Sequence, residues 1–202
     1  MKKYSQYGQD ELLNQLLNKK NGFFIDIGAH DGISFSNSYL FETELEWNGI
    51  CIEPLPNVFK KLQKNRKCIL ENCAISDIEG ILDFVAIEGY HEMLSGFNRE
   101  EIAQTSILLN SGSYEIIKVN TFRLDTILNK HNIKYADFCS IDTETTEINV
   151  LKSINWNNYQ IEYLCVERND ADQKIINYLK PYKYEYVTII KGDIILKKSL
   201  MI

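Results

Sequence analysis

The sequence lacks any hydrophobic run long enough to cross a membrane, and residues 1–6 (MKKYSQ) do not lead into the apolar core of a signal peptide. It also lacks a dense run of lysine and arginine, and its formal net charge is −6. An acidic chain without a basic patch matches a nucleic-acid backbone poorly. We therefore expect a cytoplasmic protein with no membrane span and no nucleic-acid partner.

Cysteine pairs with the Cys-x-x-Cys spacing of a zinc or redox motif are absent, and the five cysteines are an odd number. Four of them lie in or beside apolar segments and the fifth follows one: Cys51, Cys68, Cys139, Cys165 and Cys73. Single cysteines in apolar segments behave as small core residues, which argues against a disulfide framework and against zinc. We expect reduced cysteines, as is typical of cytosolic proteins.

The chain does contain apolar segments that alternate with helical patterns. The expected strands are residues 23–27, 49–53, 67–72, 81–86, 114–119, 137–142, 161–167, 183–190 and 194–197, and the expected helices are residues 11–18, 35–47, 57–65, 123–129, 147–154 and 172–179. This alternation predicts an α/β fold with a mostly parallel sheet, and the last two strands predict a hairpin. A chain of 202 residues that is 45% hydrophobic can bury one core, so we expect a single domain over residues 1–202.

Residues 23–32 (FFIDIGAHDG) are the most informative stretch. A short apolar strand ends at Asp26 and opens onto Gly28 and Gly32, which is how a parallel strand delivers the chain into a ligand-binding turn. A dinucleotide fingerprint needs Gly-x-Gly-x-x-Gly, because its middle glycine lets the backbone approach a pyrophosphate. His30 occupies that middle position. A nucleoside ligand without phosphates fits better, and S-adenosylmethionine is the obvious candidate.

Acidic residues end several of the expected strands: Asp26, Glu53, Asp142 and Glu167, with Asp77 close behind the third strand. The carboxyl ends of parallel strands meet at one edge of a sheet, so these carboxylates should surround one crevice. Their mutual repulsion must be offset by a ligand or a cation. We interpret this regularity as functional.

Each acid can be assigned a part of the ligand. Glu53 lies 21 residues after Gly32 (53 − 32), close to the roughly 20-residue offset at which an acid binds ribose hydroxyls. Asp26 would hold the amino group of the methionine part, and Asp142 would lie beside the sulfonium and the acceptor. The adenine would face residues 73–77, through the three side chains Ala74, Ser76 and Asp77.

At these residues the chain resembles the FkbM family of S-adenosylmethionine-dependent methyltransferases. The matching motifs, whose order and spacing are together fairly specific, are residues 5–10 (SQYGQD), 24–32 (FIDIGAHDG) with Ser36 beyond, 49–54 (GICIEP), 72–77 (NCAISD), 124–128 (LDTIL), and 140–144 (SIDTE) with Glu147 and residues 150–152 (VLK) following. One position departs from the family pattern, because Thr145 stands where the family usually has glycine after Asp-x-Glu. A β-branched residue tolerates positive φ poorly, so this turn must differ or be strained.

The resemblance implies a Rossmann-like, seven-stranded sheet that ends in an antiparallel hairpin, and methyl transfer to a hydroxyl of a nucleotide sugar, glycan or glycosylated metabolite. It also implies that residues 1–20 fold over the cofactor pocket. With the assignments above, the expected cofactor-binding residues are Gln9, Asp26, Gly28, Ala29, His30, Asp31, Gly32, Ser36, Glu53, Pro54, Ala74, Ser76, Asp77 and Asp142. The partner would be a small-molecule or glycan acceptor, and a homo-oligomer is compatible with the sequence.

A sugar hydroxyl needs a base or a metal to lower its pKa before it accepts a methyl group. The candidate bases are Asp142, His91 and Glu144, with His30 as a weaker candidate. His91 belongs to residues 88–113, an aperiodic, polar stretch that we expect to form a loop or lid on the acceptor side.

Magnesium is the other route, since Asp142, Glu167 and Asn169 would offer it hard oxygen ligands.

Two alternatives to a methyltransferase stay open. One is a nicotinamide-dependent oxidoreductase, which His30 disfavours. The other is a catalytically degenerate cofactor-binding module, which Thr145 favours and the retained acids disfavour.

Overall fold

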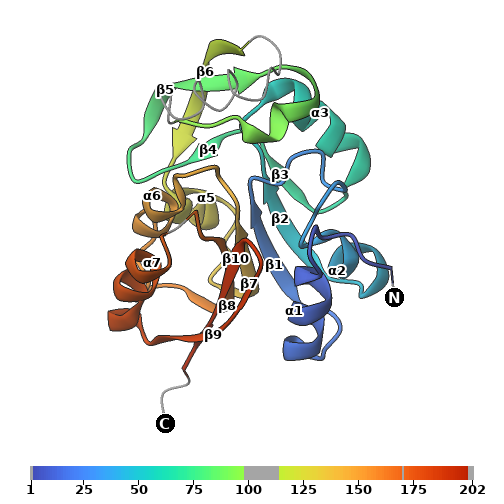
Figure 1. Ribbon diagram of the computed structural model, residues 1–202, viewed down its shortest axis with the longest axis vertical. Helices are drawn as coiled ribbons and strands as arrows, with labels where there is room; N and C mark the ends of the chain where they lie inside the picture. Colours follow the sequence, from blue (N-terminus) through green and yellow to red (C-terminus); the bar gives the residue numbers. More distant parts are fainter. Residues whose placement is uncertain (1, 98–113, 170, 200–202) are drawn as a thin grey trace.

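The computed structural model describes residues 2–97, 114–169 and 171–199 and contains a seven-stranded sheet in the order β3-β2-β1-β7-β8-β10-β9 (Figure 1). Its strands are β1 (Phe23–Ile27), β2 (Asn48–Ile52), β3 (Ile69–Glu71), β7 (Tyr135–Ile141), β8 (Gln160–Glu167), β9 (Tyr184–Ile190) and β10 (Asp193–Lys198). The first three strands, β7 and β8 run parallel, whereas β10 is antiparallel to both β8 and β9. The predicted Rossmann-like fold with a terminal hairpin is confirmed.

Helices cover both faces of this sheet: α1 (Gln9–Leu17), α2 (Tyr39–Glu44) and α3 (Pro56–Asn65) cover one, and α5 (Leu124–Lys130), α6 (Glu147–Lys152) and α7 (Asp172–Leu179) cover the other. The alternation of side chains along each strand produces this arrangement. Phe24 packs in a buried cluster with Leu13 and Phe41, while its neighbour Ile25 packs in a second cluster with Ile127 and Ile175.

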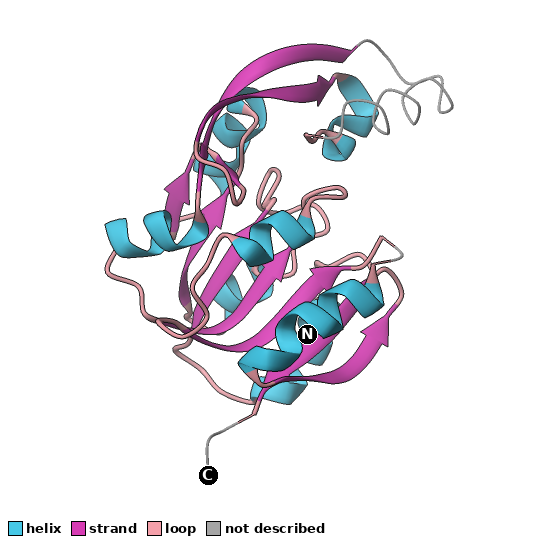
Figure 2. Cartoon of the chain, turned by 90° about the vertical axis from the view of Figure 1, so that its left-hand side faces the viewer, coloured by secondary structure: helices cyan, strands magenta, loops and turns pink. Residues whose placement is uncertain are grey.

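A second, smaller sheet has the order β4-β6-β5, built from β4 (Ala74–Ile75), β5 (Gly80–Ile87) and β6 (Tyr114–Phe122). Figure 2 shows it above the large sheet. The sequence predicted β5 and β6 but not the two-residue β4. The 3-10 helix η1 (Gly89–Leu94) follows β5, and Leu94 packs on Val85 and Ile87 beneath it. A second 3-10 helix, η2 (Lys180–Tyr182), follows α7.

The helix expected over residues 35–47 is wrong in extent, because α2 has only six residues. Phe35 has a φ of +56°, which lies outside the helical region. Ser36 Oγ then accepts the N–H groups of Ser38 and Tyr39, at 3.2 and 3.1 Å, so the helix starts at Tyr39. Within the described ranges, no helix has the length and apolar character that crossing a bilayer requires.

Candidate active site

A cavity of about 400 Å³ lies at the carboxyl ends of β1, β2, β7 and β8. Nine of the fourteen expected cofactor-binding residues line it besides Asp142: Gln9, Asp26, Gly28, Ala29, His30, Ser36, Glu53, Pro54 and Ala74. Glu144 and Glu167 also line it. The regularity of acids at strand ends therefore does bring these carboxylates around one crevice.

The turn after β1 requires glycine at its first position. Gly28 has a φ of +83°, and a Cβ placed on it would lie 1.7 Å from the backbone oxygen of Asp142. The N–H groups of Gly28 and Ala29 both donate to the carbonyl of Ile52, at 3.0 and 3.1 Å. These bonds tie the turn to the end of β2, and the missing side chain lets the end of β7 approach.

Glu53 is held at the cavity by two backbone N–H groups. Its Oε2 accepts from His30 at 3.0 Å and its Oε1 accepts from Leu55 at 2.8 Å. Burial raises the pKa of Glu53 to about 7, although these two hydrogen bonds act in the opposite direction. Each oxygen still has lone pairs that can accept a ligand hydroxyl.

Asp26 lies in a buried polar network on the α1–α3 face of the sheet. Ser38 Oγ donates to its carboxylate, and Arg66 Nη2 donates to the same hydroxyl at 3.0 Å. Burial raises the pKa of Asp26, and the Arg66 guanidinium opposes that rise. Arg66 also pairs with Glu42 at 2.6 Å. This arrangement places the Asp26 carboxyl group at the cavity wall, in one hydrogen-bonded network with the Arg66 guanidinium.

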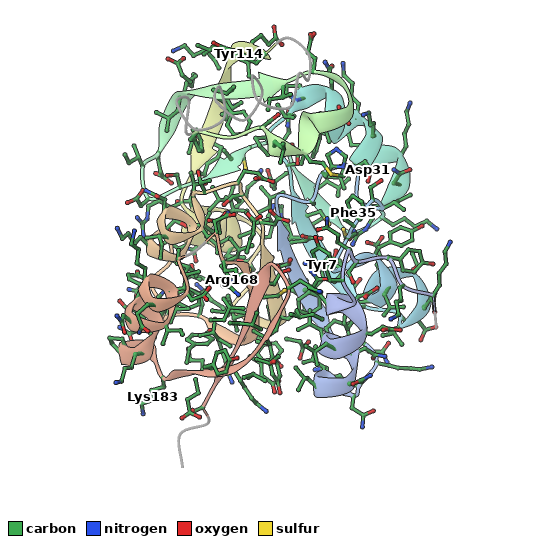
Figure 3. All side chains as sticks on the ribbon, in the orientation of Figure 1. Tyr7, Asp31, Phe35, Tyr114, Arg168 and Lys183 are labelled. Carbon is green, nitrogen blue, oxygen red and sulfur yellow. The ribbon has the colours of Figure 1, made fainter. Side chains whose placement is uncertain are left out.

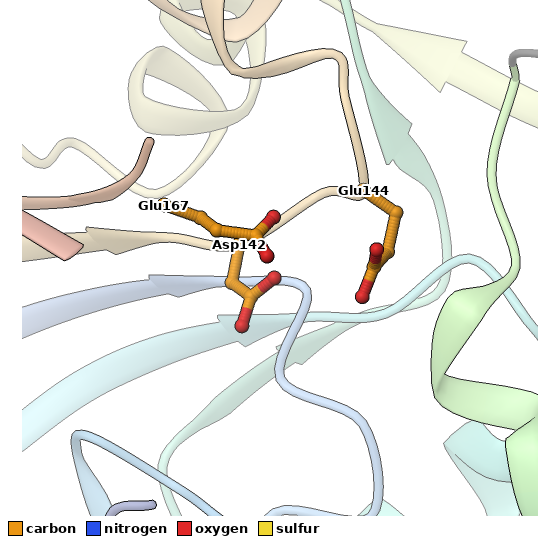
Figure 4. Close-up of side chains that lie close together, drawn as sticks. All are labelled: Asp142, Glu144 and Glu167. Carbon is orange, nitrogen blue, oxygen red and sulfur yellow. The ribbon is translucent and has the colours of Figure 1, made fainter. Parts of the chain in front are cut away.

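Three carboxylates meet at the ends of β7 and β8 (Figure 4). Oxygens of Asp142, Glu144 and Glu167 lie within 4.8 Å of one another. Asp142 faces the open cavity but is otherwise enclosed by protein, and burial together with Glu167 and Glu144 raises its pKa. Burial and the nearby Glu147 raise the pKa of Glu167 to about 7. Such a group can accept a proton near neutral pH or contribute to a cation site.

Asp193 adds a fourth carboxylate from the start of β10, where it pairs in register with Glu167. Gln9 Nε2 donates to it at 2.5 Å, which fixes the N-terminal segment over the cavity. Tyr7 and Phe35 line the cavity while their side chains are 47% and 55% exposed, so they lie at its mouth (Figure 3). Gln6, Tyr7 and Gln9 are the residues of the N-terminal segment that line the cavity, and the role of residues 1–20 as a cover for a cofactor stays a prediction.

The helix η1 forms the other wall and is tied to the turn after β1. Glu92 Oε1 lies 3.2 Å from His30 Nε2 and 2.5 Å from Lys61 Nζ on α3. Glu92 and its neighbours Met93 and Leu94 line the cavity. The side chain of His91 and residues 98–113 lie outside the described part of the structure, so the proposed base and most of the expected lid stay predictions.

Four expected cofactor-binding residues lie outside the cavity lining: Asp31, Gly32, Ser76 and Asp77. The carboxylate of Asp31 accepts two backbone N–H groups of its own turn, at 2.8 and 2.7 Å. A Cβ on Gly32 would lie 2.6 Å from Arg66 and from Leu62, so this glycine serves the packing of α3. Asp77 accepts from Asn149 on α6 at 2.9 Å.

Asn169 also lies outside the cavity lining and is exposed. Its amide nitrogen donates to Glu167 Oε2 at 2.7 Å. Asn169 thus presents a donor to the acid cluster, whereas a cation would need its carbonyl oxygen.

The sequence did not indicate several residues that line the cavity, among them Asn37, Glu92, Ser140 and Asp193. Ser140 carried a usable signal, since it precedes Asp142 by two positions on a strand and so points to the same face. Asp193 falls between the two strands expected for the terminal hairpin, 183–190 and 194–197, and no local pattern indicates that this turn lies beside Glu167.

The strained turn is present. Glu144 and Thr145 have φ values of +51° and +81°, a region that glycine adopts freely and β-branched residues rarely adopt. The turn is therefore strained, and it keeps Glu144 on the cavity wall. Glu147 is buried at the start of α6, where it accepts from the N–H and the hydroxyl of Thr143, both at 3.2 Å.

Charge is the cavity's most distinctive property. Its described lining contains seven carboxylates, namely Asp26, Glu53, Glu92, Asp142, Glu144, Glu167 and Asp193, and no lysine or arginine. A polyphosphate would be repelled by such a lining, whereas a cation would be attracted.

The chain is similar to known methyltransferases in sequence and in fold. The model of the methyltransferase FkbM domain matches residues 26–186. The methyltransferase FkbM from Methylobacillus flagellatus has a TM-score of 0.54 at 14% identity; the match covers 87% of this chain and 43% of that protein, so this chain spans less than half of its length. The methyltransferase domain of METTL16 has a TM-score of 0.50 at 12% identity, with coverages of 94% and 65%.

The structure of Aeropyrum pernix fibrillarin, which contains bound S-adenosyl-L-methionine, has a TM-score of 0.48 at 10% identity, with coverages of 96% and 73%. No curated protein matches the sequence. The likenesses to the Methylobacillus flagellatus protein and to METTL16 show the fold, and the family model covers most of the chain. The chain therefore belongs to the FkbM methyltransferase family.

Proposed function

We propose that the protein transfers a methyl group from S-adenosylmethionine to a hydroxyl of a carbohydrate. The observation that carries the choice of donor is the cavity lining of seven carboxylates without lysine or arginine among the described residues. S-adenosylmethionine has a sulfonium and an ammonium against a single carboxylate, so it is a net cation. A nicotinamide dinucleotide carries a pyrophosphate, which this lining would repel.

The residues at the cavity fit the parts of this donor. Glu53 would accept the ribose hydroxyls, because a buried carboxylate makes strong charge-assisted hydrogen bonds. The adenine would contact the apolar stretch that lines the cavity beyond Glu53, which includes Leu55, Ala74 and Phe84. Gly28 lets the end of β7 close against the turn after β1, because a Cβ there would lie 1.7 Å from the backbone oxygen of Asp142.

The donor supplies an electrophilic methyl group, and the chain must position the acceptor hydroxyl and remove its proton. Glu167 suits the role of base because its pKa is raised to about 7. Asp142 lies beside Glu167, so the two carboxyl groups bind and release protons as a pair. A positioned base of this kind contributes roughly 10²–10⁴-fold to a rate.

The charge of the cavity also bears on the acceptor. Carboxylates accept hydrogen bonds from sugar hydroxyls but repel phosphate groups. A neutral glycan or glycosylated metabolite therefore fits better than a nucleotide sugar. Magnesium held by Asp142, Glu144 and Glu167 is a separate possibility for activating the hydroxyl, and chelation tests it.

The experiment is methyl transfer from isotope-labelled S-adenosylmethionine to a panel of neutral oligosaccharides, glycosides and nucleotide sugars, with and without chelator. We expect label in neutral carbohydrate and a loss of about 10²-fold or more for Glu167→Gln. Glu162→Gln, on the same strand but outside the cavity lining, should behave like the wild type. Transfer that favours nucleotide sugars, or that is absent from every carbohydrate, would contradict the proposed acceptor; loss of activity with chelator would favour the metal.

A further inference from the structure

Asn37 lines the cavity with a side-chain oxygen that has no partner. It lies in the turn before α2 and is only 8% exposed. Its Nδ2 donates to Ser140 Oγ at 3.0 Å and lies 3.8 Å from Cys165 Sγ. Its Oδ1 is buried and accepts no hydrogen bond within the described part of the chain. A buried carbonyl in that state is costly unless a ligand donates to it.

The register of the sheet locates this oxygen relative to the acids. Ser140 on β7 pairs with Asp26 on β1 and with Cys165 on β8, so Asn37 lies over the same face as the Asp26 carboxylate. Ser140 precedes Asp142 by two residues. The Asn37 amide is thus deeper in the crevice than the carboxylates at the strand ends, where we place the acceptor.

On the basis of the proposed function, we propose that Asn37 Oδ1 and the Asp26 carboxylate together bind the α-ammonium group of the donor's methionine part. An ammonium has three N–H donors and no acceptor, so it needs several oxygens. Ser38 donates to one oxygen of Asp26, which leaves the other oxygen free to accept one of these donors. The unpaired oxygen of Asn37 supplies a further acceptor.

Calorimetry with S-adenosylhomocysteine, which keeps the ammonium group but cannot react, tests this assignment. The matched probe is the analogue whose α-amino group is replaced by hydrogen. We expect Asn37→Ala to lower the affinity for S-adenosylhomocysteine by roughly ten- to a hundredfold, the range for a lost hydrogen bond to a charged group. The same variant should lower the affinity for the deamino analogue by less than about twofold.

Two further variants keep the outcome interpretable. Asn37→Asp retains an oxygen at the site and should bind S-adenosylhomocysteine within about threefold of the wild type or more tightly. Asn65→Ala removes an amide that donates to the Asp31 carbonyl at 2.8 Å outside the cavity lining, and it should change neither affinity.

Equal weakening of both ligands by Asn37→Ala would overturn the assignment, because it would indicate a structural role. The assignment would also be overturned if Asn37→Ala weakened the binding of S-adenosylhomocysteine but not of an analogue that lacks the carboxylate of the methionine part. The amide nitrogen of Asn37 would then face the ligand's carboxylate. Failure of the proposed function is distinguishable: with a wrong donor the wild type would bind neither S-adenosylmethionine nor S-adenosylhomocysteine, whereas a wrong acceptor would leave both affinities unchanged.

Discussion

Thr145 shows how a single residue can keep a site in place at a cost in stability. Its φ of +81° lies in a region that β-branched residues rarely adopt, and its hydroxyl is buried without a partner among the described residues. The neighbouring Glu144 nevertheless lines the cavity. The substitution therefore does not by itself remove the site, which weakens the case for a degenerate module.

We expect Thr145→Gly to raise the free energy of unfolding by about 1 kcal/mol, because glycine adopts positive φ without strain. Thr146 provides the matched control, since its φ is −113°. Thr146→Gly should lower the stability by about 0.5–1 kcal/mol through added chain entropy. Denaturant unfolding of both variants measures this, and a destabilised Thr145→Gly would show that the turn is not strained.

Glu53 should make donor binding depend on pH. Its pKa of about 7 means that the carboxylate gains its charge as the pH rises through neutrality, and the charge strengthens hydrogen bonds from ribose hydroxyls. We expect affinity for S-adenosylhomocysteine to rise from about pH 6 to about pH 8 in the wild type.

In Glu53→Gln the affinity should fall about tenfold at the higher pH, and its pH dependence over this range should be lost. Glu44→Gln, outside the cavity lining, is the control. Calorimetry at several pH values provides the measurement, and an unchanged pH profile in Glu53→Gln would rule out this role.

Some site residues could be predicted from sequence because a strand fixes them. Asp26, Glu53, Asp142 and Glu167 follow apolar strands whose parallel order brings their ends together. Asn37 could not be predicted in this way, because its position depends on an irregular turn that delays α2. Backbone geometry of that kind has no period that a sequence pattern reveals.

The 3-10 helix η1 packs on β5 through Leu94, and polar contacts of Glu92 join it to the opposite side of the cavity. The ion pair between Glu92 and Lys61 and the contact to His30 join it to α3 and to the turn after β1. Lys61 is 51% exposed, so the pair is weak. We infer that η1 can move away from the cavity more easily than the strands can.

Lys61→Ala should speed release of S-adenosylhomocysteine about two- to fivefold, in proportion to the small energy of an exposed ion pair. Stopped-flow displacement measures the rate. Lys60→Ala removes an adjacent exposed lysine that makes no ion pair to the described part of η1, and it should have no effect. If both variants release the ligand alike, η1 is held by other contacts.

The small sheet could be predicted only in part from the sequence. β5 and β6 were expected as strands from their apolar, β-branched residues, but their pairing with β4 depends on residues far apart in the chain. Ala74 and Ile75 form a strand only because Thr121 and Phe122 lie beside them. Two residues are too few to show a strand pattern.

At the scale of the whole molecule, the cavity places like charges together before any ligand arrives. Glu53 and Glu167 both have a pKa of about 7, above the ordinary 4.5. The folded protein therefore holds protons that the unfolded chain has released. This contribution to stability is complete below about pH 4.5 and is lost as the pH rises through 7.

Glu167→Gln should accordingly raise the free energy of unfolding at about pH 8 by about 1 kcal/mol, after allowance for solvent screening, and the gain should vanish near pH 5. Glu162→Gln should show no such dependence. Thermal unfolding across this pH range measures both. Because the same change should slow methyl transfer by about 10²-fold or more, a variant that is more stable yet slower would separate the catalytic role of Glu167 from folding.

The central claim is that the carboxylate-lined cavity binds a cationic nucleoside. Calorimetric titration of the unliganded chain with S-adenosylmethionine and, separately, with a nicotinamide dinucleotide tests it most directly. We predict one-site binding of S-adenosylmethionine and no heat of binding from the dinucleotide. Binding of the dinucleotide in place of S-adenosylmethionine, or binding of neither, would contradict the account.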